Sequence, residues 1–385
     1  MVETGRRAAQ QRPRTPSNKI GRFCIARIVD VPLAEVIHGN YDWPERSDRM
    51  KAIAQDMYGS PDDVLELRDI GIPVITDNDV LVRVRAAAVN PPDWAGVTGV
   101  PYIARIATGL RKPRNGVRGS DVAGTVAAAG TNVQDLRVGD EVLGSGAGTF
   151  AEYAVASGTN LVRKPATVTF EQAAAVPMSG LTALQALRDQ GHVQPGQKVL
   201  INGAGGGIGT FAVQIAKTLG AEVTGVCSTT KVDLVRSIGA DHVIDYTTED
   251  FTRGDQRYDF ILDNVLNHSL SRLLHAMKPK GTLVANGGQF YKRWIAGTGV
   301  ILVQAPLLSL VKPQRIRSVR LSRNHDDLLA LTSSWNPARS HRSSTGLPTE
   351  PNPRGHRLLR TRTRPRKSRH HPPYEDRRSR SAALR

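Results

Sequence analysis

Between residues 50 and 170, short segments alternate apolar and polar positions, the period of strands with one buried face. Glycines and the turn-forming run Asp77-Asn78-Asp79 separate them. The strands predicted by this pattern are residues 51–54, 80–89, 124–130, 138–143 and 150–155. Thr169 is a suitable N-cap, and residues 170–175 and 179–188 are predicted to be helical. This part of the chain is therefore expected to be a small, mostly β domain followed by helix.

From residue 198, short continuous apolar runs alternate with segments of helical period. Gly220 and Gly239 follow the two predicted helices, where glycine commonly ends a helix. The predicted strands are residues 198–202, 222–227, 242–245, 259–264 and 281–286, and the predicted helices are 210–219 and 231–238. The alternation indicates an α/β fold with a doubly wound parallel sheet of at least five strands. A length of 385 residues also favours two domains.

The glycine-rich segment 203–209 directly follows an apolar strand and opens a helix near Ile208. In register with a dinucleotide fingerprint, the three glycine positions fall on Ala204, Gly206 and Gly209, so the first is alanine. A helix N-terminus offers free N–H groups to a pyrophosphate. The candidate cofactor-binding residues here are Ala204, Gly205, Gly206, Gly207 and Ile208. A structural turn without a ligand is the alternative.

The end of the second predicted strand indicates which dinucleotide binds. An NAD-selective site places Asp or Glu there to hold the ribose 2′-hydroxyl. The residues after Cys227 are instead Ser228, Thr229, Thr230 and Lys231. Hydroxyls and a cation suit a 2′-phosphate, which predicts NADPH and makes Ser228, Thr229 and Lys231 candidate ligands. The alternative is that these hydroxyls only cap the following helix.

The net charge of +17 by itself would suggest a nucleic-acid partner, but the excess of basic residues is unevenly distributed along the chain. Residues 1–49 hold 9 Lys+Arg and 6 Asp+Glu, residues 50–332 hold 29 and 26, and residues 333–385 hold 14 and 3. Most of the excess therefore lies in an Arg-, Pro- and Ser-rich tail whose composition favours disorder. Nucleic-acid binding by this tail is an alternative function, but no specific nucleic-acid partner is expected.

Other features of the composition exclude several classes of protein. Two cysteines, Cys24 and Cys227, exclude a disulfide framework and a zinc finger. No apolar run reaches the roughly 20 residues of a membrane span. The first thirty residues lack the apolar core of a signal peptide, so a cytoplasmic location is expected.

Taken together, these motifs resemble the medium-chain dehydrogenase/reductase superfamily, in its zinc-free quinone reductase branch. The resemblance runs from Met50 to about Thr332. Beside the glycine loop it rests on AAAVNPPDW at 86–94, GSDVAG at 119–124, VGDEV at 138–142, SGLTA at 179–183 and LVRSIGAD at 234–241. It implies a GroES-like catalytic domain at 50–172, a Rossmann NADP-binding domain at 173–308, and the start of a return to the first domain at 309–332. A homodimer is among the assemblies it leaves open.

The resemblance also implies a cleft between the two domains and roles for residues along it. Asn90 and Asp93 would line the substrate side and are the candidate catalytic residues. Thr182 would touch the nicotinamide or its ribose, Tyr246 would pack by the phosphate end of the cofactor, and Asn286 is a further candidate cofactor ligand. The alternatives are that the segment from Asn90 to Asp93 is only a turn and that Tyr246 is a surface aromatic.

Zinc-dependent members of this superfamily have cysteine at the position of Asn90 and Gly-His-Glu at the position of Gly119-Ser120-Asp121. Asn90 and Ser120 are poor zinc ligands, so no metal site is expected. Without a Lewis acid, the substrate must already be activated by conjugation. The expected activity is NADPH-dependent reduction of quinones or α,β-unsaturated carbonyls. The alternatives are an enoyl reductase with a longer substrate channel and an NAD(P)-dependent alcohol dehydrogenase-like enzyme.

Both ends of the chain depart from the resemblance. Codons compatible with residues 333–347 and 349–372, read in shifted frames, can encode the ending that the superfamily leads one to expect, including Gly-Lys-Val-Val-Ile. Residues 333–385 are therefore expected to be a frameshift product. Loss of the expected ending would leave the strands at 51–54 and 80–89 without apolar cover. Residues 1–49 are expected to be a non-native N-terminal extension, because Glu45-Arg46-Ser47 can be encoded by a ribosome-binding-like purine run.

Overall fold

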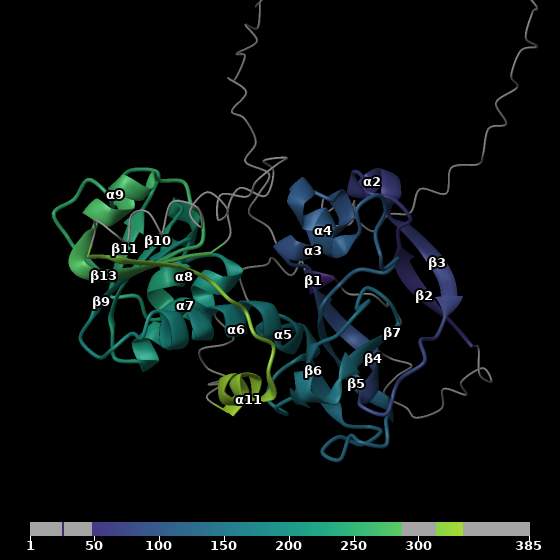
Figure 1. Ribbon diagram of the computed structural model, residues 1–385. Helices are drawn as coiled ribbons and strands as arrows, with labels where there is room; N and C mark the ends of the chain where they lie inside the picture. Colours follow the sequence, from purple (N-terminus) through teal and green to yellow (C-terminus); the bar gives the residue numbers. More distant parts are fainter. Residues whose placement is uncertain (1–24, 27–47, 287–312, 334–385) are drawn as a thin grey trace, which may run out of the picture.

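The computed structural model describes residues 25–26, 48–286 and 313–333. Two lobes lie side by side, a β-rich lobe and a lobe built on a parallel sheet (Figure 1). The predicted N-terminal extension and the predicted basic tail lie almost wholly outside the described residues. Within the described residues, no helix is long and apolar enough to cross a bilayer.

The β-rich lobe contains an antiparallel sheet in the order β1-β4-β5-β6-β8, with β7 also pairing with β4. Val80, Val82 and Val84 point into its core and are buried, as the predicted alternation requires. Its strands are β1 (Ile25–Ala26), β4 (Asp79–Ala88), β5 (Asp121–Ala129), β6 (Glu141–Ser145), β7 (Tyr153–Ser157) and β8 (Leu161–Arg163). Three short helices complete the lobe: α2 (Pro61–Val64), α3 (Pro91–Thr98) and α4 (Arg105–Thr108).

A separate hairpin of β2 (Arg49–Ala54) and β3 (Glu66–Gly71) lies against this sheet. Neither β3 nor β8 was predicted, because β3 is largely exposed and β8 has only three residues. Met50 and Ala52 of β2 are buried against Ala151. The expectation that the strands at 51–54 and 80–89 would lack apolar cover is therefore wrong.

The start of β6 also differs from the prediction. Residues 138–140 form a turn rather than strand, since Gly139 has a φ of +95° and the Arg137 N–H donates to Asp140 Oδ2 (2.9 Å). Val138 is accordingly exposed.

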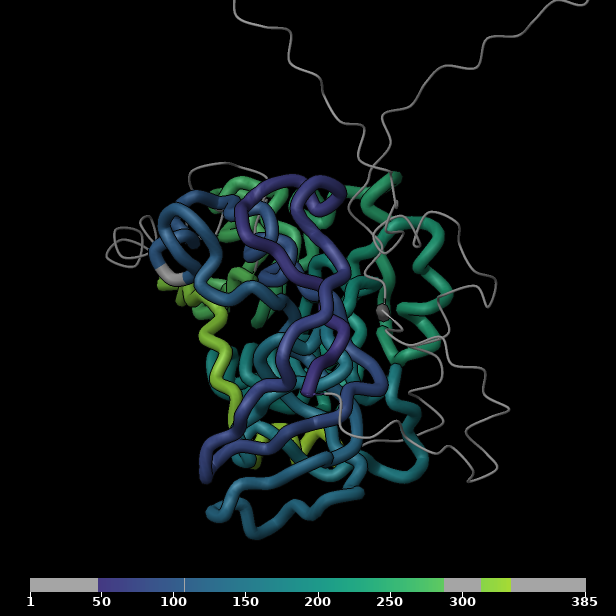
Figure 2. Tube along the Cα trace, turned by 90° about the vertical axis from the view of Figure 1, so that its right-hand side faces the viewer, coloured from purple at the N-terminus to yellow at the C-terminus, as the bar shows by residue number. Residues whose placement is uncertain are grey.

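A pair of helices connects the lobes. Thr169 caps α5 (Phe170–Ala174) as predicted, accepting from the Gln172 N–H while the Gln172 side chain returns to the Thr169 N–H. α6 (Val176–Gln185) follows and is extended by a π-helical turn, Ala186–Gln190. The last described segment runs from the parallel sheet to α11 (His325–Ser333), beside α6 (Figures 1 and 2).

The second sheet has six parallel strands in the order β11-β10-β9-β12-β13-β14, so the doubly wound prediction is confirmed. Three predicted strands have the observed bounds. The strands are β9 (Lys198–Asn202), β10 (Glu222–Cys227), β11 (His242–Asp245), β12 (Tyr258–Asp263), β13 (Met277–Ala285) and β14 (Arg315–Ser318). The helices are α7 (Gly207–Thr218), α8 (Val232–Ser237) and α9 (Leu270–His275). β14 was not predicted, because alternating arginines mask its strand pattern.

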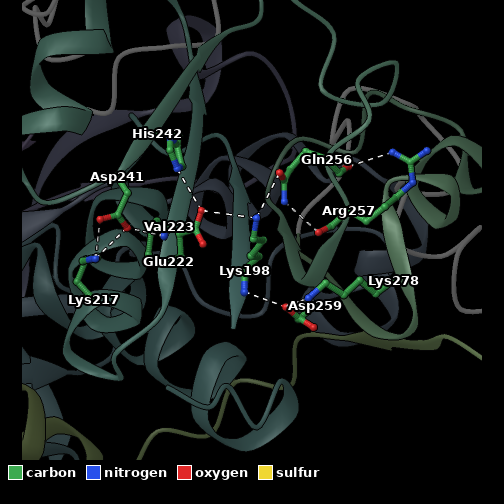
Figure 3. A network of polar contacts seen from close by, with 10 residues as sticks. All are labelled: Lys198, Lys217, Glu222, Val223, Asp241, His242, Gln256, Arg257, Asp259 and Lys278. Carbon is green, nitrogen blue, oxygen red and sulfur yellow. Dashed lines mark hydrogen bonds and ion pairs between the residues drawn. The ribbon is translucent and has the colours of Figure 1, made fainter. Parts of the chain in front are cut away.

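The amino edge of this sheet is occupied by ion pairs between neighbouring strands (Figure 3). Glu222 lies 3.1 Å from His242 and 3.9 Å from Lys198, and Lys278 pairs with Asp259 at 2.8 Å. The glycine loop follows β9 at the opposite, carboxyl edge. Ligands of parallel α/β sheets bind beyond the carboxyl ends of the strands, so this edge is the expected place for a ligand.

Candidate functional site

The glycine loop is folded tightly between β9 and α7. Gly203 has a φ of +82°, and its N–H and that of Ala204 both donate to the Val226 carbonyl of β10. A Cβ on Gly209 would lie 2.1 Å from the Gly203 carbonyl oxygen, so only glycine allows this approach of helix to loop. α7 begins at Gly207, next to Ile208 where the helix was expected to open and three residues before the predicted range 210–219. Its first N–H groups have no acceptor within the helix, and the loop therefore fits a pyrophosphate.

The predicted phosphate ligands lie beside this loop. The stem of Lys231 packs on the loop backbone, since a Cβ on Gly205 would lie 2.9 Å from Lys231 Cβ. Ser228 and Thr229 occupy the turn between β10 and α8, and both are at or near the protein surface. The Tyr246 N–H donates to the Cys227 carbonyl (3.1 Å), which brings Tyr246 to the same edge with its ring half exposed. The structure thus brings these sequence-predicted residues together.

A carboxylate that sequence reasoning missed lies among them. Asp245 is the last residue of β11 and is in register with Cys227, the last residue of β10. Its side chain accepts hydrogen bonds from Thr229 and Thr247. The sequence signal for an acidic ligand is an Asp or Glu at the end of the strand after the glycine loop, whereas Asp245 is supplied by the next strand in the sheet.

Side-chain amides line the central part of the carboxyl edge. Asn286, after β13, donates to Asn264 Oδ1 (2.7 Å), and Asn264 in turn donates to the Asn202 carbonyl. Asn202 Nδ2 donates to the buried Asp263 at 2.8 Å. Asn286 was predicted as a cofactor ligand, but its partners were not. The sequence signal for this row of side chains is a polar residue at or directly after the end of each apolar strand: Asn202, Asp263 and Asn286.

In the β-rich lobe, the predicted catalytic pair belongs to a buried polar cluster at the start of α3. Asp93 Oδ2 accepts from the Asn90 N–H (2.8 Å), and this segment is the start of helix α3. Asn90 Nδ2 donates to Asp121 Oδ2 at 3.0 Å. Asp121 is fully buried at the start of β5, and Asn90 and Asp93 are nearly so. The sequence motif 119–124 contained Asp121, but it was not predicted as a site residue.

Burial disfavours the charged form of both carboxyls in this cluster. It raises the pKa of Asp121 to about 7, against hydrogen bonds from the Met178 N–H and Asn90 that lower it. It raises the pKa of Asp93 to about 6, opposed by the Asn90 N–H and by the cations Arg323 and Arg118. The cluster therefore changes charge near neutral pH.

Exchanging Asp121 for asparagine is expected to remove a pH dependence of stability. Because the folded-state pKa, about 7, lies above the ordinary 3.8, the protonated carboxyl favours folding. Its contribution is complete below about pH 4 and is lost as pH rises to about 7. The melting temperature of Asp121→Asn minus that of the native chain should therefore rise from about pH 4 to about pH 7 and then level off. The control is Asp255→Asn, which changes an exposed carboxylate; its melting temperature minus that of the native chain should not vary with pH. A difference that does not vary with pH in Asp121→Asn would contradict the raised pKa of Asp121.

The first turn of α6 joins this cluster to the glycine loop. The Met178 N–H donates to Asp121 Oδ2 at 2.9 Å. The next residue, Ser179, touches the loop, since a Cβ on Gly207 would lie 3.0 Å from Ser179 Oγ. Thr182 lies one turn further along α6 and is buried. Two consecutive residues therefore connect the candidate substrate side with the candidate cofactor side.

Four buried side-chain atoms near Asp121 have no hydrogen-bond partner within the described part of the chain: Arg118 Nη2, Ser120 Oγ, Asp121 Oδ1 and Thr149 Oγ1. Buried polar atoms are normally paired, so each of these four atoms is left able to bond a water or a polar ligand. Arg118 was not predicted either; burial lowers the pKa of its guanidinium, and Nε donates to Gln55. Among residues 48–286 and 313–333, no three His, Cys, Asp or Glu side chains form a metal-binding group.

Comparison with known proteins places this architecture in a family. Residues 76–166 match the alcohol dehydrogenase GroES-like domain, and residues 207–320 match the domain described as zinc-binding dehydrogenase. The mouse (Mus musculus) protein "NAD(P)H oxidoreductase RTN4IP1, mitochondrial" is 35% identical over 289 residues, covering 69% of this chain and 68% of the mouse protein. The chain belongs to the medium-chain dehydrogenase/reductase superfamily.

Solved structures of oxidoreductases are similar to this chain over most of its length. The quinone oxidoreductase from Coxiella burnetii is 29% identical, with a TM-score of 0.64, covering 77% of this chain and 89% of that one. CurK enoyl reductase is 25% identical, with a TM-score of 0.61, covering 77% of this chain and 86% of that one. The chain is an oxidoreductase of this superfamily with a GroES-like domain and a Rossmann-like parallel sheet, and the predicted fold class is confirmed.

Proposed function

We propose that the protein is an NADPH-dependent oxidoreductase that reduces quinones or α,β-unsaturated carbonyls by hydride transfer without a metal. The observation that carries this proposal is the first turn of α6, where Met178 contacts the buried polar cluster and Ser179 contacts the glycine loop. A dinucleotide on the loop and a substrate at the cluster would be neighbours. The printed names of the mouse relative and the Coxiella structure support a nicotinamide cofactor and a quinone substrate.

The residues of the chain would divide the work between binding and orientation. When bound, NADPH supplies the hydride. Lys231, Ser228 and Thr229 would hold its 2′-phosphate, and the N-terminus of α7 would face its pyrophosphate. One N–H of the Asn90 carboxamide is held by Asp121. The other would donate to the substrate oxygen on which negative charge develops.

Metal independence is supported by the chemistry of the side chains at the positions equivalent to zinc ligands. The lone pair of an amide nitrogen is delocalised into its carbonyl, so Asn90 Nδ2 is no ligand for a cation; it donates a hydrogen bond to Asp121 instead. Ser120 is a poor zinc ligand. The substrate therefore must be an acceptor already polarised by conjugation.

The direct test is to follow oxidation of NADPH with a panel of quinones, enones, saturated aldehydes and alcohols, with and without a zinc chelator. Turnover of quinones or enones that is indifferent to the chelator supports the proposal. Turnover restricted to saturated aldehydes or alcohols and lost on chelation would establish the alcohol dehydrogenase-like alternative.

Reversing the charge of Lys231 is expected to weaken NADP⁺ binding about tenfold more than NAD⁺ binding, because Lys231→Glu sets a carboxylate against the 2′-phosphate. Calorimetric titration of both nucleotides measures the ratio. Lys280→Glu makes the same charge change on β13 and should leave the ratio unchanged. Equal loss of both nucleotides in Lys231→Glu would rule out the assignment of Lys231 to the 2′-phosphate.

An enoyl reductase acting on long acyl chains is the second candidate function. The elements that follow Asn90 carry exposed apolar side chains, which suit an acyl chain: Trp94, Ile103, Ile106 and Leu110. The CurK enoyl reductase and the Aspergillus terreus "Trans-enoyl reductase pgmF", 39% identical over 201 residues, support the same candidate. A steep rise of kcat/KM with acyl length would favour it over quinone reduction.

The remaining expectations stay predictions. The cytoplasmic location is one of them, and the name of the mouse relative states that that protein is mitochondrial. Homodimer formation is another. Nucleic-acid binding by residues 333–385 would be tested by comparing nucleic-acid affinity of the full chain and of a chain ending at residue 332.

A further inference from the structure

Asp245 lies at the carboxyl edge of the parallel sheet, where it contacts Thr229, a predicted phosphate ligand. It closes β11, whose register with β10 pairs Asp245 with Cys227. The Tyr246 N–H, bonded to the Cys227 carbonyl, keeps the two strand ends together beyond this pair. The side chain of Asp245 therefore lies beside the turn that carries Ser228 and Thr229, although β11 was not expected to contribute to the site.

Hydrogen bonds fix this carboxylate in its ionised form. Thr229 Oγ1 donates to Oδ2 at 2.5 Å, while the N–H and hydroxyl of Thr247 donate to Oδ1 at 2.9 and 2.7 Å. These bonds, the one from Thr229 foremost, hold the pKa of Asp245 below its usual range. Asp245 is half-buried at the protein surface, so solvent and salt screen part of its field.

The neighbouring cation does not neutralise this charge. No ion pair joins Lys231 to Asp245 in the part of the chain that the structure describes, and the stem of Lys231 packs over Gly205 on the loop side of the turn. The turn thus has a cation on one flank and a carboxylate on the other. The hydroxyl of Thr229, a predicted phosphate ligand, is bonded to that carboxylate.

We propose that Asp245 is a specificity-determining residue that limits the preference for NADPH and allows NADH to bind at the same site. This inference rests on the cofactor site of the proposed function. The single hydroxyl hydrogen of Thr229 is donated to Asp245, so a 2′-phosphate at Thr229 would compete with this carboxylate for the donor. It would also lie about 5 Å from the carboxylate, where like charges repel. A free 2′-hydroxyl could donate to the same carboxylate, the role that acidic residues have in NAD-selective sites.

The test is calorimetric binding of NADP⁺ and NAD⁺ to the full chain, which needs no turnover. Asp245→Asn keeps oxygen for Thr247 but loses the charge. We expect it to shift the ratio of affinities toward NADP⁺ about tenfold. The shift should shrink between about 0.05 and 0.5 M salt, because charges at the protein surface are screened. Asp245→Glu, which restores the charge, should return the ratio toward that of the native chain, and Asp255→Asn, an exposed carboxylate in the loop before β12, should not change it.

The outcomes separate this inference from the proposed function. An unchanged ratio in Asp245→Asn, or an equal loss of both nucleotides, would overturn the role of Asp245 while leaving the cofactor site standing. A shift of the ratio that persists unaltered at high salt would overturn the electrostatic cause. A native chain that binds neither nucleotide would overturn the proposed function, and the inference with it.

Discussion

Replacing Gly209 by alanine is expected to abolish dinucleotide binding and to lower the free energy of unfolding by about 3 kcal/mol. The added Cβ would lie 2.1 Å from the Gly203 carbonyl oxygen and 2.6 Å from Ala204 Cα. Both are backbone atoms, which cannot turn aside as a side chain does. Either α7 must move away from the loop or the loop must open, and each change displaces the N–H groups that would face the pyrophosphate. Denaturant unfolding and NADP⁺ titration measure the two effects.

The matched control is Gly254→Ala, because no heavy atom lies within 4 Å of a Cβ placed there. Its free energy of unfolding should change by no more than about 0.5 kcal/mol, with nucleotide binding intact. A Gly209→Ala chain that is as stable as this control would show that the loop is looser than the structure describes. If it were destabilised yet bound NADP⁺ normally, the loop would not be the pyrophosphate site.

Replacing Asn90 by alanine is expected to reduce kcat/KM for a quinone or enone about 100-fold, mainly through kcat, since a donor to a developing oxyanion acts in the transition state. The same change leaves Asp121 Oδ2 with only the Met178 N–H as a donor. A buried acceptor that loses a partner costs about 1–3 kcal/mol, so the variant should also melt earlier. Steady-state kinetics and thermal unfolding measure the two consequences separately.

Asn132→Ala is the control for the loss of an amide. Asn132 donates to Asn78 at the exposed surface of the β-rich lobe, and its removal should alter neither kinetics nor stability appreciably. A second comparison, Asn90→Asp, keeps the size of the side chain but exchanges a donor for an acceptor beside Asp121. If Asn90→Ala lost stability while kcat stayed at the native value, Asn90 would be a structural residue of the α3 start, as its alternative interpretation holds.

Local chemistry along the chain determined much of the fold. The Thr169 and Gln172 side chains form the capping box of α5 between residues three apart, so the start of that helix depends on few neighbours. The strands β9 and β10 are mostly apolar and buried, as the core of a parallel sheet requires, and β11 is a short strand at the edge of that sheet. The observed bounds of all three equal the predicted ones. Strands with few apolar residues, β3 and β14, lacked such a signal.

The candidate site depended on the tertiary structure instead. The sequence alone placed Lys231 near the phosphate, but only the packed sheet sets its stem against Gly205 and brings Asp245, sixteen residues from Thr229, to the same turn. Asp121 meets Asn90 across 31 residues and Met178 across 57. Residue types and their periods determine which segments become strands and helices, because those depend on neighbours along the chain. Burial, charge and the pKa of a carboxyl depend on neighbours in space, and these are settled only when the two sheets and α6 pack together.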